Sequence, residues 1–403
     1  MDGLRVLDLT TWLAGPIASH TFAGLGADVI KVESPTRFDN MRLAATKRYS
    51  TDFWWEHAPL FHGVNAGKRD IAVDLSRAEG QQLARALVAQ CDVLIENGTP
   101  RVLDRLGLGW DVVHNANPRT IVVRMPAFGL TGPWRDRPGF AQSMEQLSGM
   151  AMLTGYPDGP PINPRGPCDA IQAMQAVIAT LAALDARDRD GVGSLVEVPM
   201  VETVLAVVAE SQLEHEVYGV ELERMGNRSP VAAPQGLYAC KGDEQWLALA
   251  VETDEQWRGL RAALVWDDEP GLTTATARRA AHDELDRRLG AWAAGQALDD
   301  AVALLLAHDV PAAPAADGRF LHFDKQLNAR HFFEDVEHPF VGRYGTPGLP
   351  FRLASVDRWF HHAAPTLGQH NNVVLDMVGI DAAERQRLRT DGVIGERVAR
   401  PVG

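Results

Sequence analysis

The chain has 403 residues, of which 46% are hydrophobic and 23% charged, an ordinary globular composition with enough length for two domains. Its 39 Lys and Arg residues against 53 Asp and Glu residues give a net charge of −14, which argues against nucleic acid as the main partner. We find no basic leader with an apolar core, no uninterrupted apolar run of about 18 residues, and only three widely spaced cysteines. We therefore expect no signal peptide, no membrane anchor and a cytoplasmic location.

Strand and helix signals alternate along the first third of the chain. Leu4–Leu9 predicts a strand, Ile17–Leu25 a helix and Ala27–Glu33 a second strand. Ser76-Arg77-Ala78-Glu79 predicts a helix that opens with a capping box. Further short apolar strands are predicted at Ile71–Leu75, Asp92–Glu96 and Thr120–Arg124. This alternation predicts a parallel sheet with helices on both faces, whose ligands bind beyond the carboxyl ends of the strands.

The loops near these strand ends carry small, polar and basic residues. Taken singly, a basic residue there is usually a solvated surface charge. A shared position near strand ends, however, favours several of them facing one groove that binds phosphates. The sequence lacks Gly-x-Gly-x-x-Gly and P-loop motifs, so the common nucleotide sites are not predicted. The residues considered for this groove are Ala14, Asn65, Lys68, Arg69, Asn97, Phe128, Gly129 and Arg137.

Asp169 lies where a proline-rich loop meets a helix. The loop Gly155–Cys168 excludes regular structure, and apolar residues then recur at helical spacing as far as Leu184. One interpretation of Asp169 is an N-cap, since Asp169-Ala170-Ile171-Gln172 matches a capping box. The other is a carboxylate nucleophile that forms an acyl anhydride with an activated acyl donor. The two are compatible, because a cap would hold the nucleophile in place.

The rest of the chain predicts a smaller unit and a return segment. Ser194–Met200 predicts a strand, followed by a helix at Val201–Glu210. The composition changes at Glu223–Pro234, which we interpret as a linker. The predicted elements beyond it are a strand at Gln245–Val251, helices near Glu255–Leu264, Ala277–Ala293 and Leu298–His308, an extended segment at His331–Arg352 and a helical stretch at Asn371–Asp391.

A series of short motifs extends over essentially the whole chain. They are Arg5-Val6-Leu7-Asp8-Leu9, Leu13-Ala14-Gly15-Pro16, Leu25–Glu33, Asn65-x-x-Lys68-Arg69, Asp92–Asn97, Leu103–Gly107, Phe128-Gly129-x-Thr131-Gly132-Pro133, Gly155-x-x-Asp158-Gly159-Pro160-Pro161 and Ala364-Pro365-x-Leu367-Gly368-x-His370. With these motifs the sequence resembles the class III CoA-transferases, the CaiB/BaiF group that contains formyl-CoA, carnitine and bile-acid CoA-transferases. Asp169 falls at the position of the family's catalytic aspartate.

The resemblance implies an α/β fold, with a large Rossmann-like domain and a smaller α/β domain in an interlocked homodimer. Residues 1–222 and the return segment 331–403 would form the large domain, and residues 223–330 the small one. The implied reaction moves CoA from an acyl-CoA donor to a carboxylic acid through an aspartyl anhydride and an aspartyl-CoA thioester, without a metal. The implied CoA contacts are Ala14, Arg37, Asn65, Lys68, Arg69, Asn97, Arg105, Phe128, Gly129 and Arg137.

Departures from the family pattern concern the substrates. Ser34 stands where an arginine often stacks on adenine, and Arg37 is the expected substitute. Thr99 replaces a basic contact. The motifs Arg165–Asp169 and Ala233–Gly236 are closer to the branch that handles bulky acids, such as the benzylsuccinate CoA-transferases. The candidates for lining an apolar acceptor pocket are Trp54, Trp55 and Phe61, although core packing is the more ordinary role of each.

Three alternatives compete with this assignment. α-Methylacyl-CoA racemases share the fold and use a His/Asp pair, but the histidine would align near Phe140, and no histidine lies between His114 and His215. The second alternative is a non-catalytic subunit of a heterodimeric CoA-transferase. The presence of Asp169 argues against a catalytically inactive chain, but it does not argue against a heterodimer. Cys168 as the nucleophile is the weakest, since a cysteine in such a place is more often buried.

Overall fold

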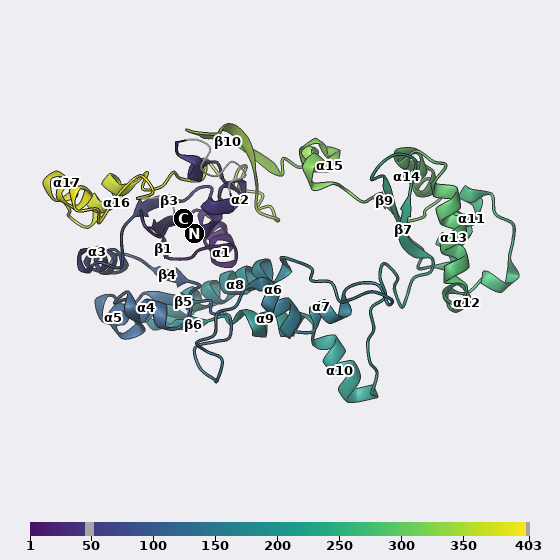
Figure 1. The fold of residues 1–403 in the computed structure, drawn as a ribbon, viewed down its shortest axis with the longest axis horizontal. Coiled ribbons are helices and arrows are strands. Elements are labelled where there is room, and N and C mark those ends of the chain that lie inside the picture. The colour runs from purple at the N-terminus through teal and green to yellow at the C-terminus, as the bar shows by residue number, and fades with distance from the viewer. Residues whose placement is uncertain (45–51, 400–403) are drawn as a thin grey trace. The chain divides into compact units, whose positions relative to one another are not determined.

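The computed structural model describes residues 1–44 and 52–399 (Figure 1). The chain forms two compact units. Unit 1 consists of Met1–Met150, Asn163–Gly219 and Lys325–Gly403, and unit 2 of Ala151–Ile162 and Val220–Asp324. The predicted domain boundaries at residues 222 and 330 stay a prediction.

A six-stranded parallel sheet organises unit 1, as the alternation of strand and helix signals predicts. The strand order is β3-β2-β1-β4-β5-β6, and every neighbouring pair is parallel. The strands are β1 (Arg5–Asp8), β2 (Asp28–Glu33), β3 (Arg69–Ala72), β4 (Val93–Glu96), β5 (Ile121–Arg124) and β6 (Leu195–Glu197). The order reverses between β1 and β4, which is where sheets of this kind open a crevice for ligands.

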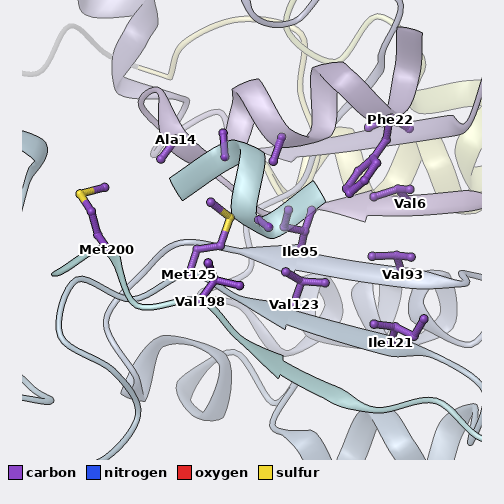
Figure 2. Packing of buried hydrophobic residues seen from close by; sticks show 14 of the residues in the cluster. Val6, Ala14, Phe22, Val93, Ile95, Ile121, Val123, Met125, Val198 and Met200 are labelled. Carbon is purple, nitrogen blue, oxygen red and sulfur yellow. The ribbon is translucent and has the colours of Figure 1, made fainter. Parts of the chain in front are cut away.

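The two faces of the sheet are covered by different helices because successive side chains point to opposite sides. Val6 belongs to the cluster that packs against α1 (Ala14–Gly24) and α8 (Pro167–Asp190). Figure 2 shows Phe22 of α1 pointing toward the strands that carry Val6 and Ile95. Leu7 belongs to the cluster on the other face, which is covered by α3 (Ala78–Val88), α5 (Trp110–Ala116), α16 (Asn371–Met377) and α17 (Ala382–Thr390).

Two helix predictions need correction. Ser76 does not cap α3, because its hydroxyl donates to Asp74 and Arg77 precedes the helix without a side-chain cap. The stretch predicted as one helix at Asn371–Asp391 is divided into α16 and α17, since Gly379 adopts a positive φ of 78° between them. The C-terminal segment, yellow in Figure 1, returns to β3, where the His370 N–H donates to Asp70 O at 2.9 Å.

Shorter elements connect the layers of unit 1. The extended segment predicted at His331–Arg352 is an antiparallel hairpin of β10 (Phe333–His338) and β11 (Gly342–Pro347). The other elements are η1 (Asn40–Ala44), η2 (Trp54–Glu56), α2 (Pro59–Gly63), α4 (Arg101–Arg105), α6 (Ala141–Leu147), α9 (Met200–Val207), α10 (Ala209–Tyr218) and α15 (Lys325–Ala329). The short helix α7 (Met150–Leu153) begins with the last residue of this part of unit 1 and continues into unit 2.

Unit 2 has its own sheet and core. Its three strands pair antiparallel in the order β7 (Gln235–Ala239), β8 (Trp246–Ala250) and β9 (Ala312–Pro314), and the sequence predicted only the middle one. Trp257 is buried in a cluster formed by the strands and helices. The helices and 3-10 turns are α11 (Asp254–Leu264), η3 (Pro270–Leu272), α12 (Ala275–Ala280), α13 (His282–Ala293), α14 (Leu298–Leu306) and η4 (Gly318–Phe323).

A buried arginine ties the loop after β2 to the C-terminal segment. Arg42 is fully buried, and its guanidinium lies 2.7 Å from Glu33 Oε2 and 2.8 Å from Glu56 Oε2. Its central carbon is 3.7 Å from the centroid of the Phe61 ring. Glu56 also accepts the Leu367 N–H at 3.0 Å. Because each charge is paired, the cluster is compatible with a position inside the protein.

Replacing Arg42 by alanine would leave the Glu33 and Glu56 carboxylates buried without their cation. We expect Arg42→Ala to lower the free energy of unfolding by about 3–5 kcal/mol, measured by chemical denaturation. The control is Arg101→Ala, since the exposed Arg101 pairs with Asp136 at the surface, where such a pair contributes at most about 1 kcal/mol. Equal losses in the two variants would contradict the assigned role.

Candidate functional site

The Asp169 carboxylate does not cap the helix that carries it. Gly166, with φ at 136°, is the residue before α8, Pro167 is the first helical residue, and no side chain caps the helix. Asp169 is therefore the third residue of the first turn, and the predicted capping box is wrong. The Gln172 amide instead donates to Val198 O at 2.7 Å and to Pro126 O at 3.3 Å. The carboxylate thus stays available for chemistry.

These contacts place the start of α8 at the carboxyl edge of the large sheet. Pro126 follows β5, and Val198 follows β6. Ala14 is the first residue of α1, directly after the loop that follows β1, and its backbone N–H donates a hydrogen bond to the Asp169 carboxylate. Asp169 therefore occupies the side of the sheet where ligands of parallel folds bind.

The surroundings of Asp169 make its carboxyl less acidic than usual. Burial raises the pKa of Asp169 to about 6, the Ala14 N–H opposes this shift, and the negative charge of Glu145 adds to it. The side chain is half-buried, so solvent still reaches it. The carboxyl is ionised at neutral pH but is more basic than an exposed aspartate, which suits a nucleophile.

Glu145 is a site residue that was not identified from the sequence. It lies on α6, is fully buried, and accepts the N–H groups of Arg165 and Gly166 at 2.9 and 2.7 Å. A signal was available: Ala141, Met144, Glu145 and Ser148 share one helix face, and the rest of that face is apolar or small. A glutamate at a position that faces the core indicates a specific partner.

A groove of about 650 Å³ opens near the carboxyl ends of β1, β2 and β3. The exposed Arg37 lines it, together with Thr11 from the loop after β1. Val102 and Leu106, which lie in and directly after α4, form another part of its wall. Arg105 is exposed at the end of the same helix. Of the predicted basic contacts, Arg37 and Arg105 therefore lie at or beside this groove.

Asn97 joins the two strands at which the sheet order reverses. Its Oδ1 accepts the Thr11 N–H at 2.9 Å, and its Nδ2 donates to Thr11 O at 2.7 Å. The amide thereby fixes the loop after β1 against the loop after β4. Its position matches the predicted site, but these two bonds already engage both its amide nitrogen and its oxygen.

Asn65 and Lys68 are buried within the fold. The Lys68 ammonium contacts Asp8, Ser19, Pro16 O and Asn65 at 2.7–3.1 Å, which satisfies its three N–H donors. Burial raises the pKa of Asp8, but the positive charges of Lys68 and Lys31 outweigh it and hold that pKa at about 2. Lys68 therefore serves as an internal counter-ion, and its ammonium does not face the groove.

Arg69 lies at the opposite edge of the sheet from Asp169. It is the first residue of β3, and its guanidinium pairs with Asp28, the first residue of β2. Both residues occupy the amino ends of parallel strands. The tertiary structure thus separates Arg69 from the remaining predicted contacts.

The other predicted contacts follow β5. Phe128 packs partly into the core beside Trp134, with ring centroids 5.6 Å apart. The exposed Arg137 lies over the same indole, 4.7 Å from its centroid. Gly129 adopts a positive φ of 101°, and a Cβ there would lie 3.0 Å from Glu197 Oε1, so the turn favours glycine.

Aromatic residues proposed for an acceptor pocket are part of the core. Trp54, Trp55 and Phe61 are all buried in one hydrophobic cluster, so their predicted role in lining a pocket is not supported. Trp12 and Phe140 are exposed aromatic residues near the site, and their rings meet edge to face at 5.5 Å. Trp12 stands two residues before Ala14, and Phe140 directly precedes α6.

Two further groups bear on the chemistry available at the site. Cys168 is buried, and burial raises the pKa of its thiol to about 12, so it is a poor nucleophile at neutral pH. Among residues 1–44 and 52–399, no group of three or more His, Cys, Asp or Glu side chains is arranged to hold a metal ion. Asp169, half-buried and with a raised pKa, therefore differs from Cys168 in that it is ionised at neutral pH.

Comparisons with known proteins agree with this geometry. The family model described as "CoA-transferase family III" matches residues 1–371. The chain is 32% identical to succinyl-CoA–D-citramalate CoA-transferase of Chloroflexus aurantiacus, over 98% of both chains. It is 31% identical to the alpha subunit of succinyl-CoA–L-malate CoA-transferase of Chloroflexus aurantiacus, over 98% of this chain and 92% of that one. A crystal structure of a CaiB/BaiF family protein from Brucella suis matches with a TM-score of 0.85 and 31% identity, over 94% of this chain and 98% of that one.

The raised pKa of Asp169 makes a prediction about stability. In the unfolded chain this carboxyl titrates near 3.8, and in the folded protein near 6, so its favourable contribution is complete below pH 3.8 and is lost as the pH rises through 6. Asp169→Asn removes the charge. We expect its melting temperature to exceed that of the wild type by about 1 °C above pH 7, corresponding to about 1 kcal/mol after allowance for solvent screening.

The melting-temperature difference between Asp169→Asn and the wild type should shrink as the pH is lowered to 4. Differential scanning calorimetry between pH 4 and 8 measures it. A difference that stays constant over this range would show that burial does not raise the pKa of Asp169.

Proposed function

Since the chain belongs to CoA-transferase family III and is a CoA-transferase, we propose that it moves CoA from an acyl-CoA donor to a free carboxylic acid through intermediates on Asp169. The observation that carries this proposal is the Asp169 carboxylate itself. It stands half-buried in the first turn of α8, does not cap that helix, and lies at the carboxyl edge of the sheet beside the start of α1.

The proposed reaction is a sequence of acyl transfers. One Asp169 oxygen attacks the thioester carbonyl of the donor, the C–S bond breaks, and a mixed anhydride and CoA thiolate result. The thiolate then attacks the aspartyl carbonyl and releases the donor acid, which leaves an aspartyl-CoA thioester. The acceptor carboxylate attacks this thioester to give a second anhydride. The thiolate finally takes the acyl group of the acceptor and restores the Asp169 carboxylate.

The start of α8 offers backbone donors for the oxyanions that form in these steps. The first-turn N–H groups of a helix have no carbonyl partner within it. The N–H groups of Arg165 and Gly166 are already bound by Glu145, and Pro167 has none. The N–H groups of Cys168 and Asp169 are therefore the candidates for oxyanion stabilisation.

The groove near β1, β2 and β3 is the proposed binding site for the nucleotide end of CoA. Arg37 lines it and Arg105 is exposed beside it, so these guanidinium groups can bind the phosphates. Ala14, Phe128, Gly129 and Arg137 are proposed along the pantetheine arm because they follow the carboxyl ends of β1 and β5. Asn97 supports the site through Thr11.

We propose a dimer from the apolar surface of α8, α9 and α10. On α8, Ile178 is 60% and Met174 56% exposed, and on α10 Val217 is 64% exposed. In the described part of the chain, α8 is the one helix long and apolar enough to cross a membrane, yet a third of that stretch is buried within the protein. A partner subunit that covers the remaining apolar residues accounts for both features.

We propose that the partner subunit is a second copy of this chain. A different chain is the alternative, since one relative is named as the alpha subunit of a CoA-transferase. The retained Asp169 favours a catalytic rather than a silent chain in either case. Phe140, at the position expected for a racemase histidine, disfavours proton exchange as the reaction.

The acyl-enzyme on Asp169 can be trapped with hydroxylamine. We expect wild-type protein incubated with succinyl-CoA or acetyl-CoA, an acceptor acid and hydroxylamine to carry a hydroxamate at Asp169, mapped by peptide mass spectrometry. Asp169→Ala should lose the modification and at least about a thousandfold in kcat, because the nucleophile is removed.

The control for this experiment is Asp111→Ala, since Asp111 is exposed in the first turn of α5. A hydroxamate at another residue, or full turnover by Asp169→Ala, would refute the mechanism. Epimerised acyl-CoA as the sole product would favour the racemase reaction. A panel of acceptor acids, followed by the mass of the new thioesters, identifies the substrates.

The proposed dimer is tested at Ile178. A charge at the centre of an apolar interface is costly, so we expect Ile178→Asp to sediment as a monomer where the wild type sediments as a dimer. Val112→Asp is the matched control, because Val112 is an exposed valine on α5, outside the proposed interface. A monomeric wild type, or an unchanged dimer in Ile178→Asp, would contradict the proposal.

A further inference from the structure

A fully buried carboxylate in α6 is bound by backbone N–H groups. Glu145 Oε2 accepts the Arg165 N–H at 2.9 Å, and Glu145 Oε1 accepts the Gly166 N–H at 2.7 Å. The Cys168 thiol is a third polar contact. A carboxylate is stable inside a protein only when hydrogen bonds replace those it made with water, and both oxygens of Glu145 have such bonds.

The two N–H groups belong to a segment with unusual backbone angles. Arg165 has a φ of 61° and Gly166 a φ of 136°, both in the region that L side chains rarely adopt. Two successive N–H groups in such a turn can point at one anion. Because Gly166 directly precedes α8, the Glu145 carboxylate holds the point at which the helix begins, three residues before Asp169.

We propose that Glu145 is a positioning residue for the transfer reaction: it fixes the start of α8, and hence the direction of the Asp169 carboxylate, and it places a second negative charge beside that carboxylate. This inference rests on the proposed role of Asp169 as the nucleophile. Glu145 acts through its neighbours and does not itself react.

The charge of Glu145 has a consequence for reactivity. The groups that act on Asp169 are the Ala14 N–H from α1, which lowers its pKa, and Glu145 from α6, which raises it together with burial. The Cys168 thiol in α8 is neutral, since burial raises its pKa to about 12. Removing the charge at position 145 should therefore lower the pKa of Asp169, while it also loosens the loop.

The matched pair Glu145→Gln and Glu145→Asp separates these two effects. Glutamine keeps the size of the side chain but has no charge and only one acceptor oxygen. Its NH2 group, a donor, would therefore face one of the two backbone N–H groups. Aspartate keeps the charge but is shorter by one methylene. Gln146→Glu is the control. It also exchanges an amide and a carboxylate, but at an exposed position on α6 that does not bind the loop.

The measurement is the rate of the first turnover, in which succinyl-CoA or acetyl-CoA releases its free acid in the absence of an acceptor, at donor concentrations up to saturation and from pH 4.5 to 8.5. The labelled residue is mapped separately by hydroxylamine trapping at one fixed pH. The wild-type rate should fall as the pH drops through about 6, since protonation removes the nucleophile. In Glu145→Gln we expect a rate about 10–100-fold lower and a midpoint shifted to lower pH, with little change in the KM of the donor. Glu145→Asp should be slower with the midpoint unchanged.

The outcomes distinguish this inference from the proposed function. Labelling of wild-type protein at a residue other than Asp169 refutes the proposed function, and this inference with it. Wild-type labelling at Asp169, with a wild-type rate and midpoint in Glu145→Gln, refutes the role of Glu145 alone. If circular dichroism shows that Glu145→Gln does not fold, Glu145→Asp decides, and a wild-type rate in that variant overturns the inference.

Discussion

A charge buried in this protein must find its partner inside the fold, and this constraint decides which polar residues at the edge of the sheet remain for a ligand. Arg42 forms ion pairs with Glu33 and Glu56, and Lys68 forms one with Asp8. These ion pairs hold the loops after β1 and β2 in place. Because they are buried, their charges cannot bind a ligand at the surface. Arg37, four residues from Glu33, stays exposed and lines the groove.

The carboxylates near α8 follow the same rule with a different result. Glu145 is buried, and its two oxygens accept two backbone N–H groups. Asp169 does not cap its helix, and burial outweighs the hydrogen bond from the Ala14 N–H, so its pKa rises. A carboxylate with a raised pKa is poorer for stability but better for attack on a thioester, which is the compromise expected of the proposed nucleophile.

Two relatives are named for citramalate and malate, and these names describe the relatives' substrates. The acceptor acid of this chain has to be identified from its own site. The aromatic residues first considered for an acceptor pocket are core residues. The exposed Trp12 and Phe140 rings are in contact with each other, near Ala14 and α6.

The sequence by itself determined the parallel sheet, the family and the position of Asp169, because strand periodicity and short motifs are local properties of the chain. It also predicted that the groove lies at the carboxyl ends of the strands. Only the tertiary structure decided which polar residues reach that groove. Arg69 lies at the amino edge of the sheet, and Lys68 is an internal counter-ion. Gln172 binds loop carbonyls instead of completing a capping box, and Glu145 binds Arg165 and Gly166, which lie 20 and 21 residues further along the chain. These partners are distant in sequence, so they are set by packing, which no local pattern records.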